Sequence, residues 1–253
     1  MVAQLSRRPV VQTLPDQVYD ILRSQIISYE LRPGHPLVEK QLAEALGVSA
    51  TPVREALLRL EHDGLVVKSR YTGGRVAEIS SNSIREVCQV RSVLEGLAAF
   101  LCTPQISAED LTMAAACIDT QMAALLRGDD ALAAEQGRRF HALILQKANN
   151  LLLRELLEPL TGHIERIRNI TYRISSVTKE SIAGHRDVLS ALTRKDAIAA
   201  ETAMRRHIIT VFDHLTNDAI ETALAALCGH VSSTGQLRKE VGSSTRDCAV
   251  AAG

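Results

Sequence analysis

Residues 47–57 read GVSATPVREAL, and this stretch decides the fold of the first third of the chain. Gly47 suits the end of a helix, and Ser49 suits the start of the next one because its hydroxyl can accept a hydrogen bond from a first-turn N–H group. Pro52 then falls in the first turn, where proline is tolerated. The buried face of this next helix is formed by apolar residues at helical spacing, namely Val53, Ala56, Leu57 and Leu60. The stretch therefore predicts two helices joined by a four-residue turn.

The flanking sequence extends this pair of helices on both sides. Upstream, apolar residues at helical spacing predict a helix from Pro15 to Tyr29, which the run RPGHP at 32–36 ends. The short helix that follows has an apolar face formed by Val38, Leu42, Ala45 and Leu46. Downstream, Gly64 ends the last helix, and β-capable runs at 65–68 and 75–79 flank a Gly73-Gly74 turn, which predicts a hairpin. This order of elements predicts a winged helix-turn-helix over residues 14–80.

Polar residues of this unit lie where a DNA-binding surface requires them. A helix fits the major groove, its N-terminal residues reach base edges, and a wing contacts the neighbouring backbone or minor groove. Thr51 and Arg54 lie in the first turns of the third helix and face away from its apolar side. Basic residues of the second helix and the hairpin are Lys40, Lys68, Arg70 and Arg75. Each charge alone is more often an ordinary solvated one, but their order along the chain favours DNA binding.

After residue 80 the sequence pattern is helical only. Amphipathic stretches with short breaks predict helices at about 83–103, 107–127, 130–148, 150–173, 178–193 and 195–227. Trp is absent and aromatic residues make up 3% of the chain, which favours helices over sheets. We therefore predict a mainly α protein with an antiparallel helical bundle over 83–227, a flexible arm at 1–13 and a disordered tail at 229–253.

Composition and charge exclude several classes of protein. Lysine and arginine together number 29, as do aspartate and glutamate, so the net charge is zero and any DNA contact must come from a local patch. The five cysteines show no CxxC pairing, which is typical of thiols in a reducing compartment. The N-terminal stretch lacks a signal-peptide core, and no run reaches membrane-spanning length. We therefore expect a cytoplasmic protein with no membrane partner.

Three histidines fall on inward-facing stripes of three predicted helices. His141, His185 and His207 each share a face with apolar residues three and four positions away. A single histidine in such a place is usually a hydrogen-bonded core residue. Three that converge indicate a divalent metal site, because neutral imidazoles are ligands for zinc, nickel and related ions. Both interpretations stay open on the residues alone.

Arg91 and Asn150 are candidates for binding a small effector. Arg91 shares its stripe with apolar residues, so its guanidinium is directed inward and needs an anionic partner. That partner is either a core carboxylate such as Glu95 or the carboxylate of a small organic acid, which matches a bidentate guanidinium. Asn150 either adds a polar contact to such a ligand or caps a helix.

The N-terminal motifs resemble the GntR family of bacterial regulators. The likeness is carried by LRPG at 31–34, LAEALGVS at 42–49 and TPVREAL at 51–57. The resemblance implies that operator DNA is contacted by Lys40, Ser49, Thr51 and Arg54, with Gly73 at the wing tip and Arg75 beside it. Two features depart from the family pattern. Ala50 stands where many members carry a base-reading arginine, and the wing sequence YTGGR at 71–75 is unusual.

The helical part resembles the FCD domain of the FadR branch of this family. The likeness is carried by VRSVLE at 90–95, FHAL at 140–143, ANN at 148–150 and MRRHI at 204–208. Metal-binding FCD domains join three histidines with an aspartate one turn before the first, and here that position is Gly137. The resemblance therefore implies either a three-histidine site for zinc or nickel completed by water or effector, or a pocket without metal. His163 and His214 are weaker substitutes for the missing ligand.

Together these features predict a homodimeric transcriptional regulator. Two winged units would hold two half-sites of a near-palindromic operator, and a small carboxylic or sugar acid in the bundle would alter DNA affinity, most often relieving repression. One alternative is a three-histidine metalloenzyme with a DNA-targeting module, but the sequence offers no nucleophile motif, general base or phosphate-binding loop. The other is a helical protein whose winged unit binds protein instead of DNA.

Overall fold

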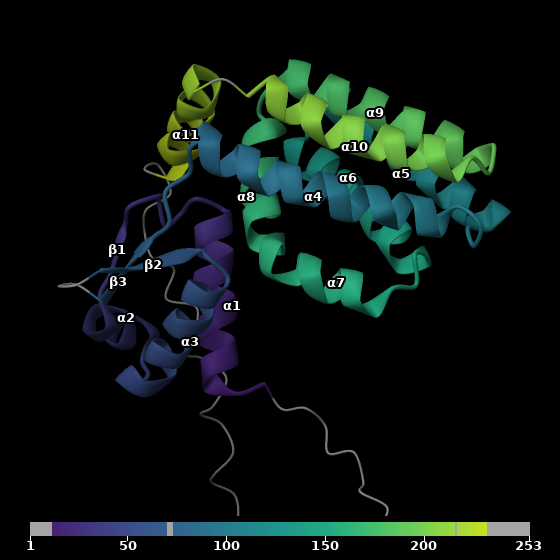
Figure 1. Ribbon diagram of the computed structural model, residues 1–253. Coiled ribbons are helices and arrows are strands. Elements are labelled where there is room, and N and C mark those ends of the chain that lie inside the picture. The colour runs from purple at the N-terminus through teal and green to yellow at the C-terminus, as the bar shows by residue number, and fades with distance from the viewer. Residues whose placement is uncertain (1–11, 70–72, 216, 232–253) are drawn as a thin grey trace, which may run out of the picture.

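The computed structural model describes residues 12–69, 73–215 and 217–231. Its first part is drawn in purple to blue in Figure 1 and consists of α1 (Leu14–Ile27), β1 (Pro36–Leu37), α2 (Glu39–Leu46), α3 (Ala50–His62), β2 (Val66–Ser69) and β3 (Gly73–Val76). A capping box between Thr13 and Asp16 starts α1. Most of the predicted arm at 1–13 lies outside the described residues, as does Arg70 of the wing.

The turn between α2 and α3 comprises residues 47–49 and is one residue shorter than predicted, because Ala50 already belongs to α3. Gly47 ends α2 in the left-handed region at φ 67°, where glycine pays no Cβ penalty. Ser49 is the N-cap residue of α3, although its side chain makes no capping hydrogen bond to the described residues. The face of α3 that packs on α1 is the predicted one, with Val53, Ala56, Leu57 and Leu60 buried. On α2, Leu42 and Leu46 pack on the core as predicted, but Ala43 is buried in place of Ala45, which is exposed.

The wing is an antiparallel sheet whose described strands have the order β1-β3-β2. Val66 of β2 pairs with Val76 of β3, and Arg75 of β3 also pairs with Pro36 of β1. The sequence did not predict β1, because its two residues fall in a proline-rich run, and proline is tolerated in an edge strand. Strand β3 also begins and ends earlier than the predicted run at 75–79.

The second part is helical throughout its described residues. Its elements are α4 (Ser81–Cys102), α5 (Ala108–Arg127), α6 (Asp130–Lys147), α7 (Leu151–Leu157), the 3₁₀ turn η1 (Glu158–Leu160), α8 (Thr161–Thr171), α9 (Ser175–Thr193), α10 (Ala197–Asp213) and α11 (Asn217–Val231). The predicted helix at 150–173 is divided where Pro159 cannot donate a helical hydrogen bond. The predicted helix at 195–227 is likewise two helices, and α11 runs past the predicted start of the tail at 229.

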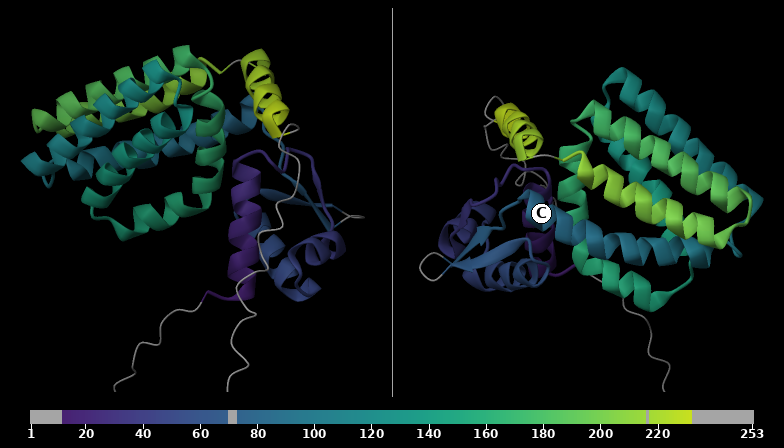
Figure 2. Two further views of the ribbon diagram at one scale, coloured as in Figure 1. Left: turned by 180° about the vertical axis from the view of Figure 1, so that it is seen from behind. Right: turned by 45° about the horizontal axis from the view of Figure 1, so that its top comes forward.

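The long helices of the second part lie side by side, and α4 packs against α10 while α5 packs against α6 and α9 (Figures 1 and 2). Most of their buried residues form one core, and a small cluster of Tyr172, Ala124, Ala133 and Ala134 is distinct from it. A separate core lies beneath α1, α3 and the wing. Among the residues that the structure describes, no helix combines the length and the apolar character needed to cross a membrane.

Helix α8 connects the two parts, because it packs against α1 at one side and against the bundle at the other. The side-chain contacts that hold it to the first part include Arg23 with Glu165 (3.0 Å), Arg166 Nη2 with the carbonyl of Ala77 (2.8 Å), Asn169 Nδ2 with the carbonyl of Ile27 (2.8 Å) and Tyr29 Oη with the carbonyl of Arg166 (3.0 Å). The N-terminal end of α8 lies close to the wing, since a Cβ on Gly162 would meet the side chain of Leu65 at 2.8 Å.

Candidate DNA-binding surface and metal centre

The predicted DNA-contacting residues share an exposed surface. Thr51 and Arg54 lie in the first turns of α3 with exposed side chains, and Lys40 is exposed on α2. The guanidinium of Arg54 is paired with Glu39, with Nη2 2.9 Å from Oε2. An exposed ion pair of this kind contributes little to stability, so Arg54 can exchange Glu39 for a phosphate or a base. The side chains by which α3 is predicted to contact DNA are therefore accessible.

The wing adds basic groups to this unit. Lys68 on β2 and Arg75 on β3 are exposed, and Gly73 opens β3 next to the described end of the hairpin. Ser49 is also exposed, at the turn that precedes α3. The structure thus leaves Lys40, Ser49, Thr51, Arg54 and Arg75 of the predicted DNA-binding set accessible.

The three predicted histidines converge inside the bundle. His141 comes from α6, His185 from α9 and His207 from α10, and all three are buried. The Nε2 atom of His141 lies 3.1 Å from Nε2 of His185 and 3.3 Å from Nε2 of His207. The ligand atoms of the three imidazoles all lie within 4.8 Å of one another. The predicted convergence of these side chains is confirmed.

The outer nitrogens of two of these imidazoles are held by other buried side chains. The Nδ1 atom of His141 contacts the carboxylate of Glu95, and Nδ1 of His185 lies 2.9 Å from Oε1 of Gln121. Both partners accept hydrogen bonds, so each Nδ1 carries the proton and each Nε2 presents a lone pair. A carboxylate or carbonyl oxygen behind the imidazole, as at His141 and His185, is the usual outer shell of a metal-binding histidine, whereas Nδ1 of His207 has no partner among the described residues.

This arrangement fits a divalent metal ion. Two lone pairs that face each other at 3.1 Å repel unless a cation lies between them. Nitrogens that lie about 2.0–2.1 Å from a tetrahedral zinc ion are themselves about 3.3 Å apart, which is close to the Nε2–Nε2 separations of 3.1 and 3.3 Å found here. His141, His185 and His207 are therefore the residues that would hold the metal. Imidazole nitrogens are ligands that suit zinc or nickel.

Burial keeps the three imidazoles in the form that binds metals. It lowers the pKa of His141 to about 4, against the opposing effect of Glu95, and it holds the pKa values of His185 and His207 well below the usual range. The histidines are consequently neutral at physiological pH. Although burial opposes ionisation of Glu95, the neighbouring charge of Arg91 keeps the pKa of that carboxyl well below its ordinary value.

The two predicted effector-binding residues have partners within the protein. Arg91 Nε lies 2.5 Å from Oε1 of Glu95, so the guanidinium has the core carboxylate that the sequence offered as one of its two partners. Its Nη2 atom lies 3.4 Å from both ring nitrogens of His141. Asn150 is the N-cap of α7, where its side chain accepts a hydrogen bond from the N–H group of Leu153 at 3.1 Å.

Other residues near the centre were not found from the sequence. The positive charge of Arg168 on α8 contributes to lowering the pKa of all three histidines. Burial, with the charge of Arg91, lowers the pKa of Arg168 itself to about 10, and this guanidinium has no hydrogen bond or ion pair to any described residue. An arginine in a helix of mixed charge carries no sequence signal that would distinguish it from a solvated one.

The two histidines considered as substitute ligands lie elsewhere. His163 is at the junction, where a Cβ on Gly64 would meet its Nε2 atom at 2.7 Å. His214 is exposed at the end of α10, with Nδ1 2.8 Å from the carbonyl of Thr210. Neither belongs to the cluster formed by His141, His185 and His207.

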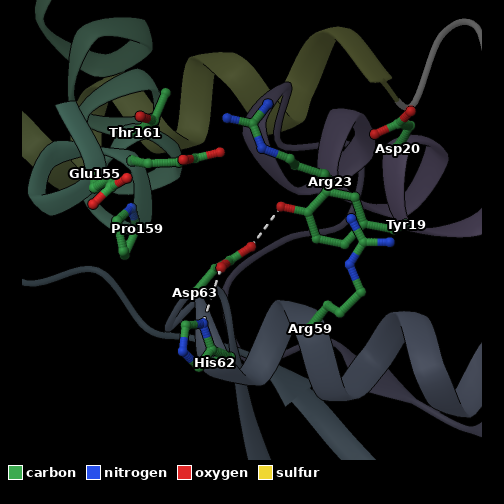
Figure 3. A pocket seen from close by; sticks show the side chains of 10 residues that line it. Tyr19, Asp20, Arg23, Arg59, His62, Asp63, Glu155, Pro159 and Thr161 are labelled. Carbon is green, nitrogen blue, oxygen red and sulfur yellow. Dashed lines mark hydrogen bonds and ion pairs between the residues drawn. The ribbon is translucent and has the colours of Figure 1, made fainter. Parts of the chain in front are cut away.

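A cavity of about 610 Å³ lies at the junction, between α1 and α3 on one side and α7, η1 and the start of α8 on the other (Figure 3). At its edge the hydroxyl of Tyr19 donates to the carboxylate of Asp63 at 2.5 Å, and burial together with this carboxylate raises the pKa of Tyr19 to about 12. The residues that line the cavity carry charges of both signs and include none of the three clustered histidines. The cavity is therefore separate from the candidate metal centre.

Comparison with known proteins finds two families in this chain. Residues 14–76 match the family of bacterial regulatory proteins named gntR, and residues 86–210 match the FCD domain. The chain is 30% identical over 199 residues to the HTH-type transcriptional repressor RspR of Escherichia coli, covering 78% of this chain and 86% of that protein. It is 28% identical over 227 residues to the Uxu operon transcriptional regulator of Escherichia coli, covering 79% and 85%. The solved structure of McbR/YncC from E. coli superposes with a TM-score of 0.63 at 26% identity, covering 87% of this chain and 99% of that one.

Proposed function

Because the chain belongs to the GntR family of bacterial regulatory proteins and carries an FCD domain, we propose that it is a homodimeric repressor whose operator affinity is lowered by a small carboxylic or sugar acid bound at a metal centre. The family is one of DNA-binding transcriptional regulators, so the metalloenzyme alternative is rejected. The observation that carries the proposal is the convergence of three neutral histidines in the domain that adjoins an exposed recognition helix. Repression is supported by relatives named as repressors, among them RspR and a probable D-xylose utilization operon repressor of Paenarthrobacter nicotinovorans.

Charge near the histidines supports an acidic effector. Glu95 forms an ion pair with Arg91, whereas Arg168 forms no ion pair with a described residue, although the charge of Glu95 also acts on it. A divalent metal held by the three imidazoles would supply a Lewis-acidic position for a carboxylate oxygen, and Arg168 would supply hydrogen-bond donors for the same group. We assign Arg168 to the effector site. Arg91 stays in the proposed site as well, with its charge paired to Glu95. Asn150 is better explained as a helix cap.

Apolar residues on the bundle surface support a homodimer. Helix α4 exposes a stripe at helical spacing that consists of Val90, Val93, Leu97 and Phe100. Helix α7, which contacts α4, exposes Leu151, Leu152 and Leu156. Exposed apolar residues in such number suit an interaction site, and a two-fold axis through them would place the two winged units for a near-palindromic operator.

Replacing Leu97 by arginine tests this dimer and the DNA-binding mode together. Two like charges would face each other across the two-fold axis, so we expect the dimer dissociation constant to rise about 100-fold or more and operator binding to fall with it. Sedimentation measures the first effect, and binding to duplexes selected from genomic DNA measures the second. Leu126→Arg is the matched control, because Leu126 is an exposed leucine of α5 outside both apolar faces. A Leu97→Arg protein that remains dimeric would contradict the proposed interface.

Helix α8 supports a route from the effector to the winged unit. The charge of Arg168 acts on the histidines, while Arg166, two residues earlier, donates to the carbonyl of Ala77 just after the wing. Arg166 is 1% exposed, and its Nε atom has no partner in the described part of the chain. A ligand can alter DNA affinity only if it favours one placement of the two parts, and α8 is the element that both sites share.

Arg166→Met should uncouple these sites. Methionine keeps much of the apolar length of the side chain but cannot donate to the carbonyl of Ala77. We therefore expect zinc and acid binding to persist, while the acid no longer changes operator affinity. The acid used is whichever of lactate, citrate, gluconate and glucuronate stabilises the wild-type protein most in thermal unfolding. Arg173→Met, at an exposed site just after α8, is the control. An unchanged acid response in Arg166→Met protein would exclude this contact from the route.

A further inference from the structure

Gly137 lies one turn before His141 on α6, and its missing side chain leaves room for the hydroxyl of Tyr172. A Cβ placed on Gly137 would lie 2.1 Å from Oη of Tyr172 and 3.0 Å from Nε2 of Gln121. The first distance is far too short for a real contact and the second is tighter than most, so no residue other than glycine fits at 137 while Tyr172 keeps this position. The glycine is therefore linked to a neighbouring arrangement of buried polar groups.

The ring of Tyr172 occupies a space bordered by small residues. It packs in a cluster with Ala124 of α5 and with Ala133 and Ala134 of α6, and all four residues are buried. Larger side chains at these positions would fill the space that the phenol takes. The small residues of α5 and α6, with Gly137, thus form a slot that matches one aromatic side chain in size.

At the end of this slot a chain of hydrogen bonds leads to the histidine cluster. Gln121 is completely buried, and its Nε2 atom donates to Oη of Tyr172 at 2.7 Å. Its other amide atom, Oε1, lies 2.9 Å from Nδ1 of His185. Both the NH₂ group and the carbonyl oxygen of a buried amide need hydrogen-bond partners. Because Tyr172 accepts from Nε2, the Oε1 atom of Gln121 stays directed at His185. His185 then carries its proton on Nδ1 and leaves Nε2 free to bind a cation.

We infer that Tyr172 and Gln121 are positioning residues for the three-histidine centre, and that Gly137 is the residue that admits them. This inference rests on the proposed metal centre, because it assigns the groups that hold one of its ligands. A side chain at 137 would not complete the centre in this chain; it would displace the group that orients His185. Tyr172 also directly follows α8, so the same hydrogen bonds connect the centre with the helix that contacts the winged unit.

The inference makes an unusual prediction for Gly137→Asp. This substitution adds a carboxylate beside three histidines and would strengthen metal binding if position 137 were an empty ligand position. We expect the opposite, a loss of zinc affinity of about 10-fold or more, because the new Cβ displaces Tyr172 and releases Gln121. Zinc affinity is measured by competition with a chromophoric chelator. Tighter zinc binding by the Gly137→Asp protein would overturn the inference.

A double-substitution cycle separates this effect from general damage to the fold. Gly137→Ala in the wild-type background meets Oη of Tyr172, so thermal stability and zinc affinity should both fall. In a Tyr172→Phe background the hydroxyl is absent and the nearest ring atom is Cζ at 3.3 Å. Gly137→Ala should therefore lower thermal stability and zinc affinity much less in that background. Equal losses in the two backgrounds would show that the contact between position 137 and the hydroxyl has no special role.

The protonation of His185 provides a readout that does not need metal. In metal-free protein with ¹⁵N-labelled histidine, we expect His185 to be protonated on Nδ1 in the wild type and to lose this preference in Gln121→Leu and Tyr172→Phe proteins. An unchanged preference in both variants would overturn the inference. If the preference shifts as expected while wild-type protein binds no zinc, the positioning role stands and the proposed metal centre fails.

Discussion

Replacing Arg54 by alanine is expected to lower operator affinity by about 100-fold or more while the protein remains a dimer. Arg54 is exposed in the first turns of α3, the part of a recognition helix that reaches base edges. An arginine bound to a base contributes roughly 1–3 kcal/mol, and a dimer loses this contribution at both half-sites. Fluorescence anisotropy with a duplex selected from genomic DNA measures the loss, and sedimentation verifies the dimer.

Arg59→Ala is the matched control for this experiment. Arg59 lies on the same helix and is paired with Asp16 at 2.7 Å, much as Arg54 is paired with Glu39, but it lies near the C-terminal end of α3. Loss of an exposed ion pair alone should therefore change operator affinity little. If Arg59→Ala and Arg54→Ala weaken binding equally, or if Arg54→Ala retains specific binding, the assigned orientation of α3 on DNA is wrong.

Joint replacement of His141 and His185 by alanine is expected to abolish measurable zinc binding. Four-ligand zinc sites are worth about 10–16 kcal/mol, or about 3 kcal/mol for each ligand, so removing two ligands should weaken binding by roughly 10⁴-fold. The remaining imidazole, His207, would then resemble a solitary core histidine. Metal content of the purified protein, followed by zinc titration, measures this change.

His214→Ala is the control, because His214 lies on the turn that ends α10 and is exposed outside the cluster. It should leave both the zinc content and the zinc affinity unchanged. If the double variant retains zinc at the wild-type stoichiometry, the convergent histidines are core residues and the metal lies elsewhere.

Local signals in the sequence predicted much of this fold because they act over a few residues. Gly47 and Pro52 define the turn between α2 and α3, and the spacing of Val53, Ala56 and Leu57 identifies the buried face of α3. The breaks at Pro159 and before Asn217 were missed, since an apolar pattern continues through both. Strand β1 was missed as well, because two residues at a sheet edge are specified by their partner strand and not by their own pattern.

Some features of the candidate site could likewise be predicted from local sequence, and others could not. Each histidine could be assigned to an inward stripe from its own helix, and that was enough to predict their convergence. From the sequence, the partner of Arg91 was either a core carboxylate such as Glu95 or the carboxylate of a small acid. Glu95, four residues away on the same helix, forms the ion pair. Gln121, Tyr172 and Arg168 carry no local signal, because their roles arise from contacts between helices distant in sequence. Gly137 was identified as a departure from the family, but its physical reason depends on Tyr172.

The most direct test of the proposed regulator is the affinity of the full-length protein for its selected operator, measured with zinc-loaded and with metal-free protein across lactate, citrate, gluconate and glucuronate. The proposal predicts that at least one acid weakens operator binding by about 5- to 150-fold, the usual range of allosteric coupling, and that chelation of the metal removes this effect. Operator affinity that is the same with every acid and in both metal states would contradict it.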